Sequence, residues 1–202
     1  NNIPRQWFME SGLKTYAYTD KAFPIGEGQT ISQPYTVAYQ TQLLNPKAGD
    51  KVLEVGTGSG YQTTVLIELG CKVFTIERQR LLFKKAELLF KKLKWKPKKI
   101  VFGDGCKGLK INAPYDGIIV TAGSPELPND LMLQLKIGGR LVIPIGNKEQ
   151  TMTRYVRISS ASTPLNFNTS SCKFSGSALS TPKNSSYFFA SSSSFGFLRF
   201  CL

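Results

Sequence analysis

The feature that most constrains this chain is a short apolar run that breaks into alternating glycines and then opens a helix. Residues 54–61 read Glu-Val-Gly-Thr-Gly-Ser-Gly-Tyr, and an apolar pattern of helical period follows over residues 61–69. Glycines permit a tight turn and let a ligand approach the backbone closely at the start of a helix. The segment therefore predicts a strand, a loop and a helix arranged around a nucleotide-type pocket.

The same unit recurs through the middle of the chain, because apolar runs of strand type alternate with segments of helical period. Such alternation predicts an α/β fold, a doubly wound and mostly parallel sheet in a three-layer sandwich. Ligands bind such sheets at the carboxyl ends of the strands. We predict strands over residues 51–55, 72–76, 99–102, 117–120 and 140–145, and helices over 33–44, 61–69, 78–93 and 126–135, the last closed by Gly138 and Gly139.

The spacing of the glycines indicates which ligand the pocket takes. A dinucleotide fingerprint would place Gly or Ala three positions after Gly58, where this chain has Tyr61. The spacing is instead GxGxG with an acid, Glu54, two residues ahead of it. This arrangement resembles the S-adenosylmethionine signature of class I methyltransferases, whose cofactor has no pyrophosphate to bind.

Two further acids fall at the ends of predicted strands. Glu77 lies about 20 residues beyond the glycine loop, where an acid accepts hydrogen bonds from ribose hydroxyls. Its alternative interpretation is a charge at a helix N-terminus. Asp104 in Gly103-Asp104-Gly105 would contact the adenine amino group, or else form an Asp-Gly turn.

The residue types that are missing narrow the reaction. Residues 120–125, Val-Thr-Ala-Gly-Ser-Pro, lack the Asn or Asp followed by Pro-Pro and an aromatic that is common in methyltransferases acting on amines. The sequence contains no histidine to act as a general base. A carboxylate acceptor is already ionised near neutral pH, so it needs only alignment and shielding from water. The sequence therefore favours a carboxylate acceptor.

Several segments, in order between Pro4 and Ile158, together resemble the protein-L-isoaspartate O-methyltransferase family. The stretch Gln-Thr-Ile-Ser-Gln-Pro at residues 29–34 is the most diagnostic, because other class I methyltransferases do not share it. The remaining segments that carry the resemblance are residues 18–26, the glycine loop, 103–105, 113–116 and 138–146.

The resemblance implies methyl transfer from S-adenosylmethionine, with S-adenosylhomocysteine as product, to the free α-carboxylate of L-isoaspartyl residues in damaged proteins. The methyl ester then collapses to a succinimide, and hydrolysis returns some normal aspartyl linkage. Ser32 would be the catalytic residue and would orient the acceptor carboxylate, although as an alternative it only caps the helix that follows.

The family pattern also implies the remaining site residues. We expect the substrate groove to be lined by Ile31, Ser32, Pro144, Ile145 and Gly146. We expect the cofactor to be bound by Gln29, Thr30, Ile31, Glu54, Gly56, Thr57, Gly58, Ser59, Gly60, Glu77, Arg78, Asp104, Gly105 and Thr121.

The chain departs from the family pattern at both ends. Residues 1–158 are predicted to be the methyltransferase domain, lacking a further N-terminal helical stretch that the family has before Ile3. Residues 159–202 are rich in serine, contain no acidic residue and match nothing in the family pattern, as a frameshift would produce. We expect this tail to be poorly ordered, and the loss of a family strand would expose an edge of the sheet.

The formal charge of +13 raises the question of an acidic partner. The lysines cluster around one predicted helix, whose apolar members are Leu81, Leu82, Leu88, Leu89 and Leu93, so a solvated face explains them without a nucleic acid. We count Lys84, Lys85, Lys91, Lys92, Lys94, Lys96, Lys98 and Lys99 in this cluster.

The cysteines and the apolar runs of the sequence give expectations about metal binding and cellular location. Four cysteines without paired spacing predict reduced thiols and no metal site. No apolar run is long enough for a membrane span and the first residues lack a signal-peptide core, so we expect a cytoplasmic monomer. Two other functions stay open: another class I O-methyltransferase, acting on a small carboxylate or an RNA, and a catalytically impaired basic binding protein.

Overall fold

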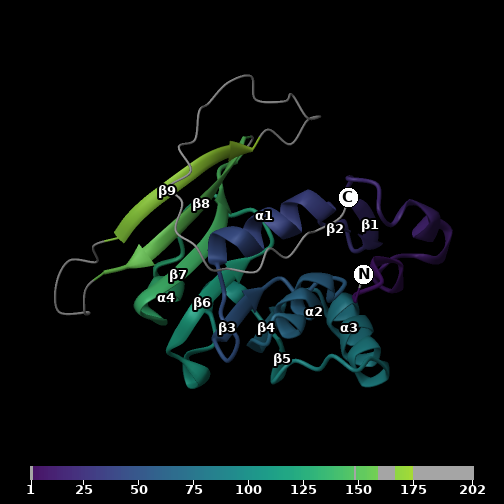
Figure 1. The fold of residues 1–202 in the computed structure, drawn as a ribbon, viewed down its shortest axis with the longest axis horizontal. Helices are drawn as coiled ribbons and strands as arrows, with labels where there is room; N and C mark the ends of the chain where they lie inside the picture. Colours follow the sequence, from purple (N-terminus) through teal and green to yellow (C-terminus); the bar gives the residue numbers. More distant parts are fainter. Residues whose placement is uncertain (1, 148, 159–166, 175–202) are drawn as a thin grey trace, which may run out of the picture.

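The computed structural model describes residues 2–147, 149–158 and 167–174, and its centre is a seven-stranded sheet (Figure 1). The strand order is β5-β4-β3-β6-β7-β8-β9, in which the first five strands are parallel and the last two are antiparallel to their neighbours. This is the predicted doubly wound, mostly parallel sheet. The strands are β3 (Lys51–Val55), β4 (Lys72–Glu77), β5 (Lys99–Phe102), β6 (Tyr115–Val120), β7 (Leu135–Ile145), β8 (Gln150–Arg157) and β9 (Phe167–Phe174).

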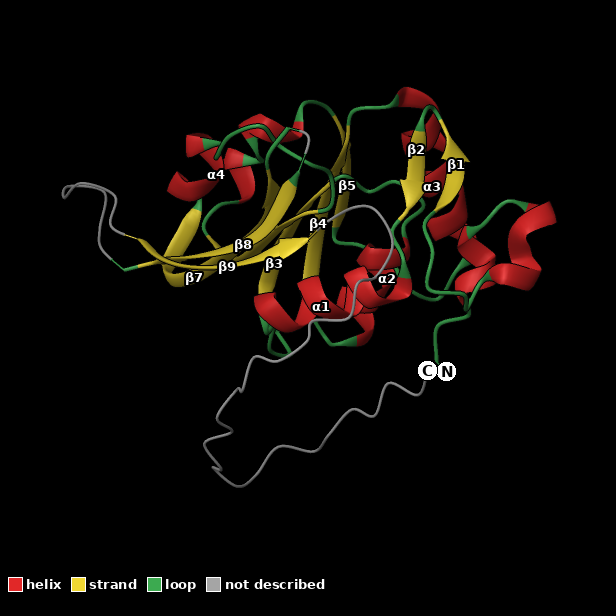
Figure 2. Ribbon diagram, turned by 90° about the horizontal axis from the view of Figure 1, so that it is seen from above, coloured by secondary structure: helices red, strands yellow, loops and turns green. Residues whose placement is uncertain are grey.

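The alternation of side chains along β3 divides the core into two layers. Val52 packs with Leu66 and Val142 beneath the helices α1 and α2, whereas Leu53 packs with Leu131 and α4 on the opposite face. Figure 2 shows α1 and α2 on one side of the sheet and α4 on the other. The helices are α1 (Pro34–Leu44), α2 (Tyr61–Glu68), α3 (Arg80–Lys92) and α4 (Asn129–Leu133).

The N-terminal part packs as a third apolar cluster against α3. Phe8, Ile25 and Ile31 are buried together with Leu82 of α3. This part consists of two 3-10 helices, η1 (Arg5–Phe8) and η2 (Ser11–Tyr16), and an antiparallel hairpin of β1 (Phe23–Gly26) and β2 (Gln29–Ile31). The hairpin leads directly into α1, so it lies at the carboxyl ends of the central strands.

The helix predicted over residues 126–135 is largely wrong. The helix α4 has only five residues, because Pro128 stands immediately before its first turn and the chain has already entered β7 at Leu135. The pair Gly138 and Gly139 does not close this helix but lies within β7. The register shifts there, from Tyr115 opposite Leu135 to Gly117 opposite Arg140, so the glycines occupy an irregularity in the strand.

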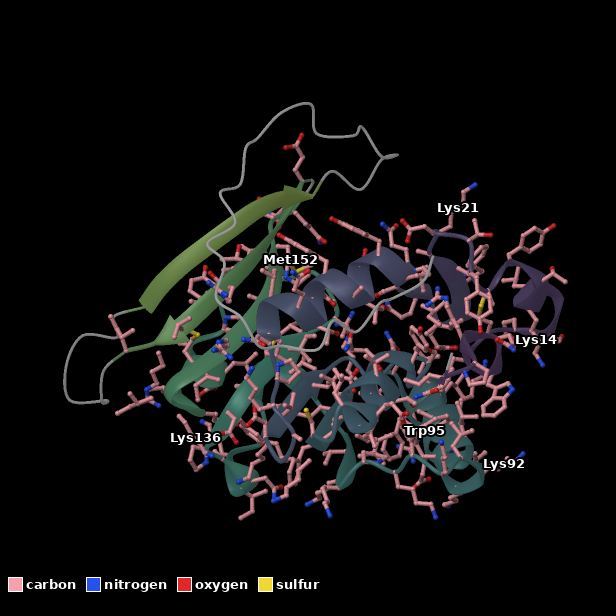
Figure 3. All side chains as sticks on the ribbon, in the orientation of Figure 1. Lys14, Lys21, Lys92, Trp95, Lys136 and Met152 are labelled. Carbon is pink, nitrogen blue, oxygen red and sulfur yellow. The ribbon has the colours of Figure 1, made fainter. Side chains whose placement is uncertain are left out.

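The C-terminal part of the described chain extends the sheet beyond the parallel strands. Met152 of β8 is buried against α1, where the Gln40 side chain donates to its sulfur at 3.5 Å (Figure 3). Strand β9, which lies within the serine-rich segment, pairs with β8 over eight residues. Residues 159–166 and 175–202 lie outside the described residues.

The lysines of the α3 region point to solvent, in agreement with a solvated helix face. All eight are exposed, and Lys92 extends away from the molecule in Figure 3. Leu82 is buried, but Leu81 and Leu88 are more than half exposed, so those two leucines were assigned to the wrong face. Trp95, which interrupts the lysine run, is buried and donates its indole N–H to Glu68 Oε2 at 2.5 Å.

Two class-level observations concern the described residues alone. Within residues 2–147, 149–158 and 167–174, no helix has the length and apolarity needed to cross a bilayer. In the same part of the chain, no group of three or more Cys, Asp or Glu side chains is arranged to hold a metal ion.

Candidate active site

A cavity of about 300 Å³ lies at the carboxyl ends of the parallel strands, where this type of fold binds ligands. Its floor is the glycine loop after β3, and its walls come from the ends of β4, β5 and β6, from β2 and from α1. Of the predicted site residues, the cavity is lined by Gln29, Thr30, Ile31, Ser32, Gly56, Thr57, Gly58, Ser59, Glu77, Arg78, Asp104, Gly105 and Thr121.

The glycine loop has a backbone that only glycine adopts without strain. Gly56, Gly58 and Gly60 have φ angles of 97°, 52° and 86°. The Thr121 hydroxyl at the end of β6 donates to the Gly56 carbonyl oxygen at 2.6 Å and also lies 3.2 Å from that of Val55. Thr121 therefore lines the cavity, as predicted, but its hydroxyl proton is used to hold the loop.

Gly60, unlike Gly56 and Gly58, does not line the cavity. It precedes the first residue of α2, and its α-carbon lies against the Phe90 ring of α3. A β-carbon at this position would come within 2.8 Å of the ring. Gly60 thus allows α2 and α3 to pack closely, which is a structural role.

The Glu77 carboxylate connects the second strand of the unit to the glycine loop. Its Oε2 accepts a hydrogen bond from the Gly58 backbone N–H at 2.8 Å, and its Oε1 accepts one from the Gln79 N–H at 2.8 Å. Each carboxylate oxygen has a second lone pair, so two bonds to a ligand remain available. Glu77 is 5% exposed and lines the cavity, a position that suits the predicted contact to a ribose.

Asp104 forms the turn that was its alternative interpretation, and it also lines the cavity. Its Oδ1 accepts from the Cys106 backbone N–H at 3.0 Å and so begins the 3-10 helix η3 (Gly105–Lys107). Gly105 is buried, and a β-carbon there would collide with Val55. The turn therefore brings both residues to the rim beside β4, where a base would follow a ribose held at Glu77.

Glu54, which the sequence places with the cofactor residues, does not line the cavity. It is fully buried on the α2 face of β3, where the Thr63 hydroxyl of α2 donates to Oε2 and Oε1 has no partner among the described residues. Burial raises the pKa of the Glu54 carboxyl to about 8, and hydrogen bonds to Thr63 and Thr75 counteract part of this rise. Glu54 therefore contacts α2 in the interior, next to the glycine loop in the sequence.

The raised pKa of Glu54 predicts a pH-dependent stability. The folded protein keeps this carboxyl protonated up to about pH 8, whereas the unfolded chain ionises it above about pH 4.5. The protonated Glu54 carboxyl therefore contributes to the free energy of unfolding at low pH. This contribution falls by about 1.4 kcal/mol for each pH unit between these values, which amounts to a few kcal/mol.

Glu54→Gln should remove this dependence, since the amide does not ionise. We expect the urea midpoint of the variant, relative to that of the unsubstituted protein, to increase steadily from pH 5 to pH 8. A difference between the two midpoints that stays constant over this range would contradict the assignment.

Ser32 lies between the end of β2 and the start of α1, at the cavity wall. Gln33 is the N-cap residue of α1, and its side chain makes no hydrogen bond to the backbone of the helix. Within the described part of the chain, the Ser32 hydroxyl makes no hydrogen bond. The capping interpretation of Ser32 is therefore wrong, and Ser32 lines the cavity together with Gln29, Thr30 and Ile31.

The predicted groove residues Pro144, Ile145 and Gly146 do not line the cavity but are hydrogen-bonded to a segment that does. The Ser124 N–H donates to the Pro144 carbonyl oxygen at 3.0 Å, and the Gly146 N–H donates to the Ser124 carbonyl oxygen at 3.0 Å. Ser124 and Pro125 line the cavity in their place. The end of β7 thus holds the wall segment and does not itself form it.

Sequence reasoning missed several lining residues that tertiary packing brings in. Gln62 on the first turn of α2 is one of them, and its amide Nε2 donates to the Thr41 hydroxyl of α1 at 3.0 Å. Val37, Tyr61 and Cys106 are others. A signal for Gln62 and Tyr61 existed, because residues in the first turn after a glycine loop face the same ligand.

Comparisons with known proteins agree on one family. The family model described as protein-L-isoaspartate(D-aspartate) O-methyltransferase matches residues 1–174. A protein-L-isoaspartate O-methyltransferase of Christiangramia forsetii is 63% identical over 156 residues, which cover 77% of this chain and 73% of the relative. A relative of the same name from Salinibacter ruber is 49% identical over 167 residues, covering 78% of this chain and 72% of the relative.

Solved structures show the same fold. One protein-L-isoaspartate O-methyltransferase structure aligns with a TM-score of 0.70 and 32% identity, covering 76% of this chain and about half, 52%, of that chain. A Plasmodium falciparum structure named for the same family, in complex with S-adenosyl-L-homocysteine, aligns with a TM-score of 0.68 and 24% identity, covering 84% of this chain and 82% of that chain.

Proposed function

The chain belongs to the protein-L-isoaspartate(D-aspartate) O-methyltransferase family, and from this premise we propose that it methylates the free α-carboxylate of L-isoaspartyl residues in damaged proteins. It is an S-adenosylmethionine-dependent carboxyl methyltransferase. The observation that carries the choice of acceptor is that Ser32 lines the cavity and that its hydroxyl has no hydrogen-bond partner in the described part of the chain.

The residues of the cavity fit S-adenosylmethionine. The glycine loop offers a surface free of side chains at Gly56 and Gly58, and Glu77 keeps lone pairs for two hydroxyls beside it. Asp104 on the neighbouring strand end has a second oxygen for a base amino group. When bound, the cofactor supplies an electrophilic methyl group on a sulfonium.

The protein residues must then align and desolvate the acceptor. A carboxylate needs no general base, which suits a chain without histidine. We assign to the Ser32 hydroxyl a hydrogen bond to one acceptor oxygen, so that the other oxygen points toward the methyl group. The buried side chains of Ile25, Ile31 and Val37 border the same space and exclude water from the reacting pair.

Methylation removes the negative charge of the acceptor carboxylate, and the reactions of the product follow from this change. Methylation converts an anionic carboxylate into a neutral ester with a better leaving group, and the neighbouring peptide nitrogen can then close a succinimide with loss of methanol. Hydrolysis of the succinimide returns part of the material to the normal aspartyl linkage. In this scheme, the enzyme's residues act only up to formation of the ester.

The test is methyl transfer from labelled S-adenosylmethionine to an isoaspartyl peptide and to its aspartyl twin, scored as base-labile ester. We expect transfer to the first peptide alone. Ser32→Ala should lower kcat/KM for the isoaspartyl peptide by about 10- to 100-fold, since one hydrogen bond to a charged acceptor contributes about 1.5–3 kcal/mol. The affinity for S-adenosylhomocysteine should stay within threefold.

Other outcomes separate the remaining interpretations. Equal transfer to both peptides would indicate a less selective carboxyl methyltransferase. Methylation of RNA but of neither peptide would indicate a different acceptor class. Undiminished turnover by Ser32→Ala would contradict the role assigned to that serine.

A further inference from the structure

The wall of the cavity that carries Ser32 belongs to a loop that is closed at its base by one hydrogen bond. The Tyr35 backbone N–H, in the first turn of α1, donates to Asp20 Oδ1 at 2.8 Å. Asp20 and Tyr35 are 15 positions apart, and the intervening residues include the hairpin β1–β2 and Ser32. The cavity residues Ile25, Gln29, Thr30, Ile31 and Ser32 all lie within this loop.

The bond occupies the place of a missing helix cap. The Gln33 side chain makes no capping hydrogen bond, and Pro34 has no N–H, so Tyr35 carries the first N–H that needs an acceptor. Asp20 supplies that acceptor from a distant segment. Its negative charge is also favourable at this end of the helix dipole.

A second contact holds the base of the loop from the other side. The buried Arg5 guanidinium of η1 lies 3.5 Å from the Lys21 carbonyl oxygen through Nη2, and it interacts electrostatically with Asp20. The same guanidinium lies over the Tyr61 ring, 5.0 Å from its centroid, and Tyr61 lines the cavity. The residue next to Asp20 is thus linked through Arg5 to Tyr61, which packs against the same apolar cluster as the hairpin.

Ser32 depends on this arrangement because it has little support of its own. Its hydroxyl makes no hydrogen bond within the described residues, and its backbone lies between β2 and α1. Strand β2 has three residues and pairs only with β1. The Asp20–Tyr35 bond is therefore one contact that holds the start of α1 relative to the segment before the hairpin.

We propose that Asp20 is a positioning residue for the acceptor carboxylate, acting through the backbone of α1 to hold Ser32 at the cavity wall. The inference rests on the proposed function. It assigns Asp20 no contact with substrate or cofactor, since Asp20 does not line the cavity. Loss of its carboxylate should disturb the acceptor side more than the cofactor side, because the glycine loop, Glu77 and Asp104 lie outside the loop that Asp20 closes.

The experiment compares two substitutions of Asp20 in the full chain. Asp20→Ala should lower kcat/KM for an isoaspartyl peptide about tenfold, while the Kd for S-adenosylhomocysteine, measured by calorimetry, rises less than threefold. Asp20→Asn should restore most of the lost kcat/KM, because an Asn side-chain oxygen is an equally good acceptor at a helix N-terminus.

Asp50→Ala is the matched control. Asp50 Oδ2 also accepts a backbone N–H at 2.8 Å, from Lys47, but it lies before β3 at the opposite end of the sheet. It should lower the melting temperature without changing kcat/KM by more than twofold. The inference is overturned if Asp20→Ala retains kcat/KM within twofold, if both alanine variants lose it equally, if cofactor affinity falls in parallel, or if Asn fails to rescue.

Failure of the inference is distinguishable from failure of the proposed function. If the unsubstituted protein binds S-adenosylhomocysteine but transfers no methyl group to the isoaspartyl peptide, the proposed acceptor is wrong. If it transfers the methyl group and Asp20→Ala does so equally well, only the role of Asp20 is wrong.

Discussion

Replacing Glu77 by alanine should weaken S-adenosylhomocysteine binding at least 100-fold, measured as Kd by calorimetry. The carboxylate does two things at once: it accepts the Gly58 and Gln79 N–H groups, and it lies where we place the ribose hydroxyls. Hydrogen bonds to a charged group contribute about 1.5–3 kcal/mol each, so losing them in a buried site accounts for a change of this size.

Two further variants separate the loop contact from the ribose contact. Glu77→Gln keeps one oxygen acceptor and should lose about tenfold in affinity. Asp116→Ala removes another carboxylate that accepts a backbone N–H, from Lys51 at 2.9 Å, but at the amino ends of the strands. It should leave Kd unchanged. A Glu77→Ala protein that retains Kd within threefold would exclude Glu77 from the cofactor site.

The sequence predicts well those parts of the fold that are determined by residues adjacent in the chain. The strand over residues 51–55 is found with the same ends, because a run of apolar residues bounded by Asp50 and the glycines is a local signal. The glycine loop is equally local, since a positive φ demands glycine wherever the chain must turn in that way. Family likeness added Ser32 and its neighbours, and the cavity contains them.

Glu54 shows how adjacency in the sequence misleads. It stands next to the glycine loop, but successive residues of a strand point to opposite faces, and Val52 on the same face packs beneath α1 and α2. Glu54 therefore meets Thr63 of α2, while Val55 lines the cavity. The alternation was readable in the sequence and would have placed Glu54 in the interior.

Other errors arose because the deciding contacts join distant residues. Nothing near Asp20 in the sequence indicates that it meets the backbone of Tyr35, and nothing near Pro144 indicates that residues 123–125 stand between it and the cavity. The short α4 has the same origin, since pairing of β7 with β6 outweighs the helical pattern at its end. Tertiary pairing decides such positions.

Gly56→Ala is the second substitution from which we expect a large effect, again at least 100-fold on the Kd for S-adenosylhomocysteine. Gly56 has a φ of 97°, and a β-carbon on its backbone would lie 2.5 Å from Thr121 Oγ1. Relieving that contact means moving the hydroxyl that holds the loop through the Gly56 carbonyl oxygen. The loop would then lose the shape against which the cofactor must lie.

Gly49→Ala separates this effect from backbone strain alone. Gly49 has a similar φ, 91°, but a β-carbon there would meet nothing within 4 Å, and the turn lies at the amino end of β3. Both variants bear a strain of about 1–2 kcal/mol, so both should melt at a lower temperature. Only Gly56→Ala should lose cofactor affinity. If both glycine variants bound S-adenosylhomocysteine equally well, the loop would adjust around Thr121 without loss of affinity, and the role assigned to the Thr121–Gly56 contact would be wrong.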